Sequence, residues 1–173
     1  MRGQRGQSGR PLTASHSGHC LLWDKAENNP AWTWPLSQED FTLAVYKHLD
    51  ETLDHFDVLG VKDWDVINEM VDQGSVNHTF YADHSGDPDI RAKIYRHVKE
   101  RYPATMLYVN DYGIINDNSN RFSLFQQLVR DLLSAGAPID GLGLQSHLHG
   151  QYLITFVCDY LQLQEMTSYL SRT

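Results

Sequence analysis

The sequence predicts an α/β fold in which parallel strands alternate with helices. Four short apolar runs lie about 40 residues apart, and segments with helical periodicity separate them. Strand–helix–strand units of this kind form parallel sheets, so we expect a parallel sheet covered by helices. It is either doubly wound or rolled into a barrel, and the pattern alone leaves both open. The length of 173 residues and the 41% apolar content fit one ordinary globular domain.

The first strand and helix are predicted near the N-terminal end. The apolar run His19–Trp23 is typical of a buried strand. Ser37 begins a helix, with Asp40 in a near-match to the capping box, and this helix is predicted to run to about His55 or Phe56. The apolar positions with helical spacing are Phe41, Val45, Leu49, Leu53 and Phe56.

The next units follow the same pattern. Residues 61–68 form a second strand-like run, and the Asp-Pro pair at 87–88 opens a helix that reaches Arg101, before Pro103. Residues 106–109 are the third strand.

One helix and one strand complete the predicted domain. The helix carries an apolar face and ends before Gly136 and Pro138, and Ile139–Gln145 forms the fourth strand. The face consists of Phe122, Phe125, Leu128, Val129, Leu132 and Leu133. We expect residues 1–17, which are rich in Gly, Gln, Ser and Arg, to form a disordered leader. The domain is then 18–150, with a divergent tail at 151–173.

Charge and hydropathy exclude two classes of partner. The formal net charge of -8 argues against nucleic-acid binding, which usually needs a basic surface. The longest near-apolar run, residues 152–158, is far shorter than the roughly 20 residues that cross a bilayer. No apolar stretch follows the arginines of residues 1–17, so no secretory signal is expected there. An uncharged partner fits best.

Polar residues follow every predicted strand. They are Trp23-Asp24, Asn68-Glu69, Asn110-Asp111 and Gln145-Ser146-His147. One such pair would usually be a cap or a turn, but four at the same end of a sheet favour a site, because barrel enzymes place their catalytic groups there. Glu69 is the candidate general acid. The alternative for Glu69 is a solvated loop carboxylate.

Metal and disulfide chemistry are not predicted. His19, His147 and His149 lack the spacing of a metal-binding motif such as His-Glu-x-x-His. Cys20 and Cys158 can pair only once and lack the close spacing of zinc or redox motifs, so we interpret them as two buried thiols.

Four motifs resemble a known family. Residues 18–23 (Gly-His-Cys-Leu-Leu-Trp) look like its Gly-His-Thr-Leu-Val-Trp strand, and residues 64–69 are similar to its Trp-Asp-Val-Val-Asn-Glu signature. Residues 108–112 and 139–148 match two further family strands. In this order, the motifs make 18–150 resemble the middle portion of glycoside hydrolase family 10, the xylanase family.

The resemblance implies a fold and an activity. The family fold is a (β/α)8 TIM barrel, of which this chain would hold about four strands with their helices. The activity is hydrolysis of internal β-1,4 linkages of xylan or related plant polysaccharides with retention, without a cofactor, in an extracellular protein. Glu69 would be the general acid/base. The residues that would contact the substrate are His19, Trp23, Asn68, Gln145 and His147.

One essential group has no counterpart. Retaining hydrolysis needs a second carboxylate about 5 Å from the acid, as the nucleophile. The family carries it in a Thr-Glu-Leu-Asp stretch on the next strand, but beyond Gly150 only Asp159 and Glu165 are acidic, in another context. We therefore expect a truncated product of a longer gene, inactive on its own. Asp24 also replaces a histidine frequent in the family.

Two alternatives remain open. One is a non-catalytic carbohydrate-binding fragment, and the other is an unrelated doubly wound α/β protein. A half barrel would leave two strand edges unpaired and part of an apolar interior exposed, which predicts aggregation or partnering.

Overall fold

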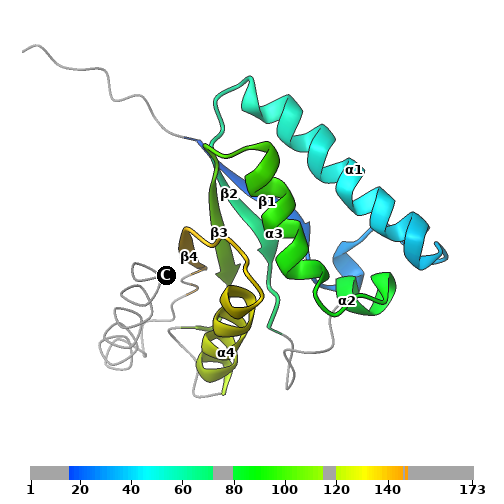
Figure 1. Ribbon diagram of the computed structural model, residues 1–173. Helices are drawn as coiled ribbons and strands as arrows, with labels where there is room; N and C mark the ends of the chain where they lie inside the picture. Colours follow the sequence, from blue (N-terminus) through cyan, green and yellow to red (C-terminus); the bar gives the residue numbers. More distant parts are fainter. Residues whose placement is uncertain (1–15, 72–79, 115–119, 146, 148–173) are drawn as a thin grey trace, which may run out of the picture.

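A four-stranded parallel sheet forms the centre of the molecule (Figure 1). The computed structural model describes residues 16–71, 80–114, 120–145 and 147. The strands are β1 (Ser17–Trp23), β2 (Asp63–Asn68), β3 (Met106–Asp111) and β4 (Gly141–Leu144). All four predicted strands are therefore confirmed. The predicted leader and tail lie almost wholly outside the described residues.

The strand order separates the two sheet architectures that the sequence allowed. The order is β1-β2-β3-β4, so each new strand is added on the same side of the one before it. Right-handed crossovers that all step in one direction place every helix on one face of the sheet. A doubly wound sheet instead reverses direction at a switch point. The sheet thus has the arrangement of part of a (β/α)8 barrel.

Four helices and two single-turn 3-10 helices connect the strands. They are η1 (Ala26–Asn28), η2 (Ala31–Thr33), α1 (Gln38–Asp57), α2 (Phe80–Ser85), α3 (Ile90–Arg101) and α4 (Arg121–Ser134). The sequence predicted α1, α3 and α4. It missed α2 and both 3-10 helices, because such short elements carry little periodic signal.

The capping interaction predicted for α1 is present. The Ser37 hydroxyl accepts a hydrogen bond from the Asp40 backbone N–H at 3.1 Å and donates to the Asp40 carboxylate at 2.7 Å. After the helix ends, Gly60 takes a positive φ of 82°, which a residue without Cβ adopts at little cost. The predicted apolar face packs against the sheet, with Leu49 fully buried.

The main core lies between the sheet and the helices. Val66 of β2, Leu107 of β3 and Ile94 of α3 have no exposed surface. Tyr95 is equally buried, and its hydroxyl donates to the Tyr108 carbonyl at 3.1 Å, so the one polar atom that it brings into the core is satisfied.

The face of the sheet turned away from this core carries a polar row. His19, Asp65, Tyr108 and Gly141 are register neighbours on the four strands. The His19 and Asp65 side chains bond to each other, and a Cβ on Gly141 would meet the Tyr108 ring at 2.6 Å. This row differs from the exposed apolar interior expected of a half barrel, because hydrogen-bonding side chains and glycine occupy its positions.

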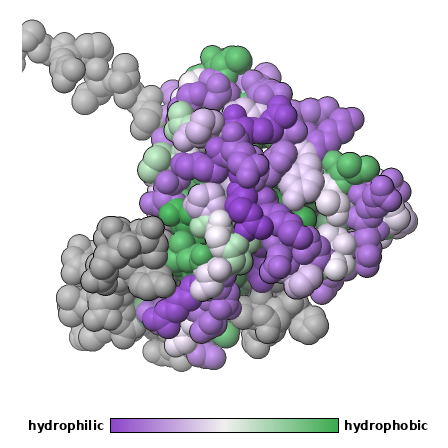
Figure 2. All heavy atoms as spheres, in the orientation of Figure 1, coloured by the Kyte–Doolittle hydropathy of each residue, from purple (hydrophilic) through white to green (hydrophobic). Residues whose placement is uncertain are grey.

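Exposed apolar side chains lie elsewhere in the described part of the chain. The large ones are Trp32, Trp34, Leu43, Val58, Leu59 and Met106. Trp32 lies in η2, Leu43 on the surface of α1 and Met106 at the start of β3, and the other three lie in loops. Figure 2 accordingly shows a mostly hydrophilic face with small hydrophobic areas. Within the described residues, the outer edges of β1 and β4 have no strand partner, as predicted.

Candidate functional site

Four of the predicted site residues meet at the carboxyl ends of β2 and β4. Glu69 follows β2 directly, and its Oε1 accepts hydrogen bonds from Gln145 Nε2 at 2.9 Å and from Asn68 Nδ2 at 3.3 Å. His147 Nε2 lies 3.1 Å from Gln145 Oε1. Residues that are distant in the sequence thus form one hydrogen-bonded cluster around a half-buried carboxylate.

A fifth member of this cluster is Asn110, the penultimate residue of β3. Its Nδ2 donates to Asn68 Oδ1 at 3.0 Å, and Gln145 Nε2 reaches the same oxygen at 3.2 Å. Two donors on the amide oxygen orient the Asn68 side chain with its NH2 group toward Glu69. The sequence marked Asn110 as a polar strand end but gave it no role. Its register position opposite Asn68 was the missing signal.

Glu69 has an unusual backbone conformation. Its φ is 56°, in the left-handed region that residues other than glycine seldom adopt, and among the described residues no other non-glycine has a positive φ. The Glu69 N–H donates to the Asn110 carbonyl at 2.9 Å, which helps to hold this conformation. Backbone outliers of this kind cluster at functional sites.

His19 and Trp23 lie on the neighbouring strand, β1. Their ring centroids are 6.1 Å apart with an edge-to-face angle of 68°, and Trp23 pairs in register with Asn68. His19 Nδ1 is 2.8 Å from Asp65 Oδ2. Because a carboxylate accepts, Nδ1 carries a proton and the imidazole orientation is fixed. The structure thus places all six predicted residues on one contiguous part of the sheet.

Asp24 does not line this site, although the sequence grouped it with the polar strand ends. Its side chain is fully buried. Oδ1 accepts from the Tyr81 N–H at 3.2 Å, and Oδ2 lies 3.9 Å from Nη1 of Arg91 on α3. The Asp24 carboxylate therefore connects β1 to α2 and α3 and has a structural role.

Asp111 is also structural. Its carboxylate accepts from the backbone N–H of Val71 at 2.9 Å and of Tyr112 at 2.8 Å, and from Arg121 Nη2 at 2.6 Å. Burial raises the pKa of the Asp111 carboxyl, while these donors act in the opposite direction. Arg121 also donates to the Val71 carbonyl at 2.8 Å, so the pair holds Val71, two residues after Glu69, against β3 and α4.

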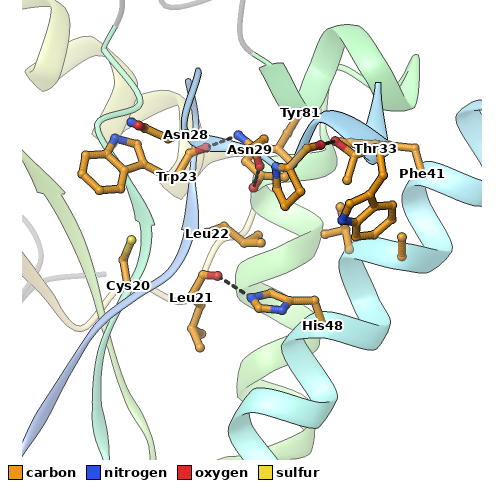
Figure 3. Close-up of a pocket in the computed structure, with 14 residues that line it drawn as sticks. Cys20, Leu21, Leu22, Trp23, Asn28, Asn29, Thr33, Phe41, His48 and Tyr81 are labelled. Atoms are coloured by element: carbon orange, nitrogen blue, oxygen red, sulfur yellow. Dashed lines mark hydrogen bonds between the residues drawn. The ribbon is translucent and has the colours of Figure 1, made fainter. Parts of the chain in front are cut away.

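A separate pocket of about 340 Å³ lies between β1, α1 and the 3-10 helices (Figure 3). His48 of α1 points toward β1 and bonds the Leu21 carbonyl at 3.0 Å. Of the predicted site residues, Trp23 alone lines this pocket. The pocket is therefore distinct from the cluster around Glu69.

Cys20 lines this pocket as a half-buried free thiol. Burial and, next, the charge of Asp65 raise its pKa to about 11. In a Cys158→Ser background we expect alkylation by iodoacetamide to accelerate up to about pH 11, with roughly a hundredfold less thiolate at pH 8 than in an unperturbed thiol. The same chain in urea should reach its plateau near the unperturbed thiol pKa. A folded-state plateau at that lower pH would contradict the prediction.

The described part of the chain holds neither a cluster of metal ligands nor a membrane-spanning helix. No three or more His, Cys, Asp or Glu side chains come together there as possible metal ligands. None of the helices described is both long enough and apolar enough to span a bilayer.

Sequence comparison identifies similar proteins. The model of glycosyl hydrolase family 10 matches residues 12–171. Endo-beta-1,4-xylanase Xyn10C of Cellvibrio japonicus is 30% identical over 144 residues, which cover 78% of this chain and 24% of the relative. Exoglucanase XynX of Acetivibrio thermocellus is 32% identical over 146 residues, covering 76% of this chain and 13% of the relative.

Solved structures support the fold. The intracellular xylanase TsXylA of Thermoanaerobacterium saccharolyticum, in a mutant complex with xylotriose, superposes with a TM-score of 0.77 and 26% identity over 88% of this chain and 51% of TsXylA. A mutant of xylanase A of P. fluorescens subsp. cellulosa, in complex with xylopentaose, superposes with a TM-score of 0.76 and 28% identity. This match covers 92% of this chain and 48% of that xylanase. The chain thus spans about half of each structure, and the predicted incomplete TIM barrel is confirmed.

Proposed function

This chain belongs to glycosyl hydrolase family 10, and on that premise we propose that it is part of a retaining hydrolase of internal β-1,4 linkages in xylan or a related plant polysaccharide. Glu69 is its general acid/base. The observation that carries this proposal is the hydrogen-bonded Glu69, Asn68 and Gln145 cluster at the carboxyl ends of the parallel strands. In barrel enzymes, catalytic groups lie at this end.

The geometry suits proton transfer by Glu69. Among the described residues, its two side-chain hydrogen bonds both fall on Oε1, so Oε2 is the oxygen that exchanges a proton with the substrate. As an acid, Glu69 protonates the glycosidic oxygen of the leaving sugar. As a base, it then takes a proton from the water that hydrolyses the glycosyl-enzyme intermediate.

Substrate contacts are proposed for the residues around this carboxylate. The second N–H of Asn68 donates to the sugar 2-hydroxyl, which requires the Asn68 amide, fully buried in this structure, to become accessible when substrate binds. The His19 and Trp23 rings line the subsite at the cleaved bond. Edge-to-face aromatic rings with polar tips suit a sugar, which presents both apolar ring faces and hydroxyl groups. Gln145 and His147 position the substrate and the nucleophile from the end of β4.

The nucleophile is the group that this chain lacks in our proposal. No acidic residue beyond Gly150 stands in a Thr-Glu-Leu-Asp context, and the two carboxylates of a retaining site must lie about 5 Å apart. The 173-residue chain alone should therefore not turn over substrate.

The test is reducing-sugar release from xylan and cellulose by the purified chain, beside Glu69→Gln. We expect no release above the blank from either protein, because the covalent intermediate cannot form. If the parent chain releases sugar and Glu69→Gln abolishes that release, another group in this chain or in a second copy supplies the nucleophile. That outcome would overturn the proposed inactivity while supporting the role of Glu69.

A second candidate is sugar binding without chemistry. The His19–Trp23 ring pair beside Asn68 favours it, because this pair makes no use of the missing carboxylate. The expected result is measurable xylohexaose affinity by calorimetry, together with an absence of hydrolysis, and Trp23→Ala should weaken this affinity. An unchanged affinity in Trp23→Ala would remove β1 from the proposed binding surface.

A further inference from the structure

We propose that Asn110 and Gly143 are positioning residues that set the geometry of the Asn68–Glu69 pair, an inference that rests on the proposed function of Glu69. Neither residue is expected to touch the substrate. They act through Asn68, whose amide must face Glu69 and the sugar at once. The juxtaposition follows from the strand register, in which Asn68, Asn110 and Gly143 lie side by side on β2, β3 and β4.

Asn110 makes two hydrogen bonds to Asn68 and Glu69, at the end of β2. Its carbonyl accepts from the Glu69 N–H at 2.9 Å, where the backbone turns into the left-handed region. Its side-chain Nδ2 donates to Asn68 Oδ1 at 3.0 Å. Because this bond and that from Gln145 Nε2 both engage Oδ1, the Asn68 NH2 group is directed at Glu69 Oε1, 3.3 Å away. A flipped Asn68 amide would place oxygen against the carboxylate, and oxygen cannot donate.

Gly143 provides the space that Asn110 occupies. A Cβ at position 143 would lie 2.6 Å from Asn110 Oδ1, 2.8 Å from its Cβ and 2.9 Å from its Cγ. Asn110 is only 6% exposed, and Asn68 on its other side is fully buried. A side chain at 143 must therefore displace Asn110, because close-packed neighbours offer no room for a small adjustment.

The simplest competing explanation is that the hydrogen bonds of Asn110 only satisfy its own buried polar groups and do not set the orientation of Asn68. The two explanations differ in what an isosteric change does. Asn110→Asp keeps the shape but replaces the Nδ2 donor with an acceptor. Asn68 Oδ1 also accepts from Gln145 Nε2 at 3.2 Å, so the proposal requires the shorter Asn110 hydrogen bond to dominate. In that case the Asn68 amide flips to donate toward position 110, and Glu69 loses a donor.

The first measurement is the pair of side-chain amide proton resonances of Asn68 in ¹⁵N-labelled protein. In Asn110→Asp we expect both resonances to move and their contact with the Glu69 side chain to disappear, while backbone resonances of α1 stay in place. The matched control is Asn120→Asp, the same chemical change at an exposed residue whose side chain makes no cap hydrogen bond. Unchanged Asn68 resonances in a folded Asn110→Asp protein would overturn the proposal.

The second measurement is a double-mutant cycle on xylohexaose affinity. Gly143→Ala alone should weaken binding by about five- to tenfold, the effect of one misplaced hydrogen bond. In an Asn68→Ala background, the same substitution should have no further effect, because the group through which it acts is gone. Equal losses in both backgrounds would show that position 143 acts independently of Asn68 and would contradict the proposal.

Two outcomes keep this inference separate from the proposed function. If Asn110→Asp fails to fold, the side-chain amide resonances of Asn68 in Gly143→Ala test the proposal instead. We expect the same movement of these resonances there, without a change of charge. If the parent chain does not bind xylohexaose, the proposed sugar contacts fail, but the Asn68 resonances still show whether Asn110 orients that amide.

Discussion

Replacing Asp111 with alanine is expected to lower the free energy of unfolding by about 3–5 kcal/mol, the effect of breaking a buried ion pair from one side. Both partners are buried, with 0% of the Asp111 side chain and 6% of the Arg121 side chain exposed. Without the carboxylate, the Arg121 guanidinium keeps its charge in the interior, and the Val71 and Tyr112 N–H groups lose their acceptor. Urea denaturation monitored by circular dichroism measures the loss.

Asp131→Ala is the matched control. Asp131 is an exposed carboxylate on α4 that accepts from Gln127 at 2.7 Å within the same helix. Its removal should change stability by no more than about 0.5 kcal/mol. Similar losses in both variants would show that the Asp111–Arg121 pair has no special role. A milder Asp111→Asn variant serves if Asp111→Ala does not fold, and its loss should still exceed that of the control.

The helices and strands were predicted where local patterns decide the structure. The boundaries of α1 follow from Ser37, Asp40 and the apolar spacing, and its capping contacts are those expected. The apolar run that ends in Asn110-Asp111 predicted β3 equally well. By contrast, α2 has six residues and does not complete two helical turns, so its packing against α1 and α3 determines it.

The site was predicted less completely, since residue type does not reveal burial. Glu69 and Asp111 both follow or end an apolar strand, yet one is half-buried beside amide donors and the other pairs with Arg121. The role of Asp24 depends on Arg91, a partner far along the chain. The contact of Asn110 with Asn68 depends on strand register, which alternating strands and helices leave undefined.

Sheet architecture is another feature that depends on three-dimensional order. Alternation of strands and helices is compatible with a doubly wound sheet and with a barrel. The sequential order β1-β2-β3-β4 resolves this, and it brings the ends of β2, β3 and β4 together around Glu69. The four sequence motifs indicated a barrel only through their resemblance to the family. The register of the strands explains why the polar residues of these motifs meet.

The largest effect is expected in a hybrid barrel. In this hybrid, residues 17–145 replace only the segment of TsXylA that aligns with them, within the 51% of TsXylA that the whole match covers. The rest of TsXylA supplies the strands that the described sheet lacks. If Glu69 is the general acid/base, the hybrid should hydrolyse xylan, and Glu69→Gln should lower kcat by about 10²–10⁴-fold, the usual contribution of such a group. Reducing-sugar release gives both rates.

The control and the choice of substrate distinguish catalysis from folding. Glu100→Gln makes the same chemical change at an exposed position on α3 and should leave kcat unaltered. An aryl xyloside carries a leaving group that needs little protonation, so the loss in its first, glycosyl-transfer step should be much smaller than with xylan. A structural defect would lower the rates of hydrolysis of both substrates to the same extent. If Glu69→Gln retains the parent rate on xylan, the proton donor lies elsewhere, and the hydrogen-bonded cluster at the ends of β2, β3 and β4 serves binding alone.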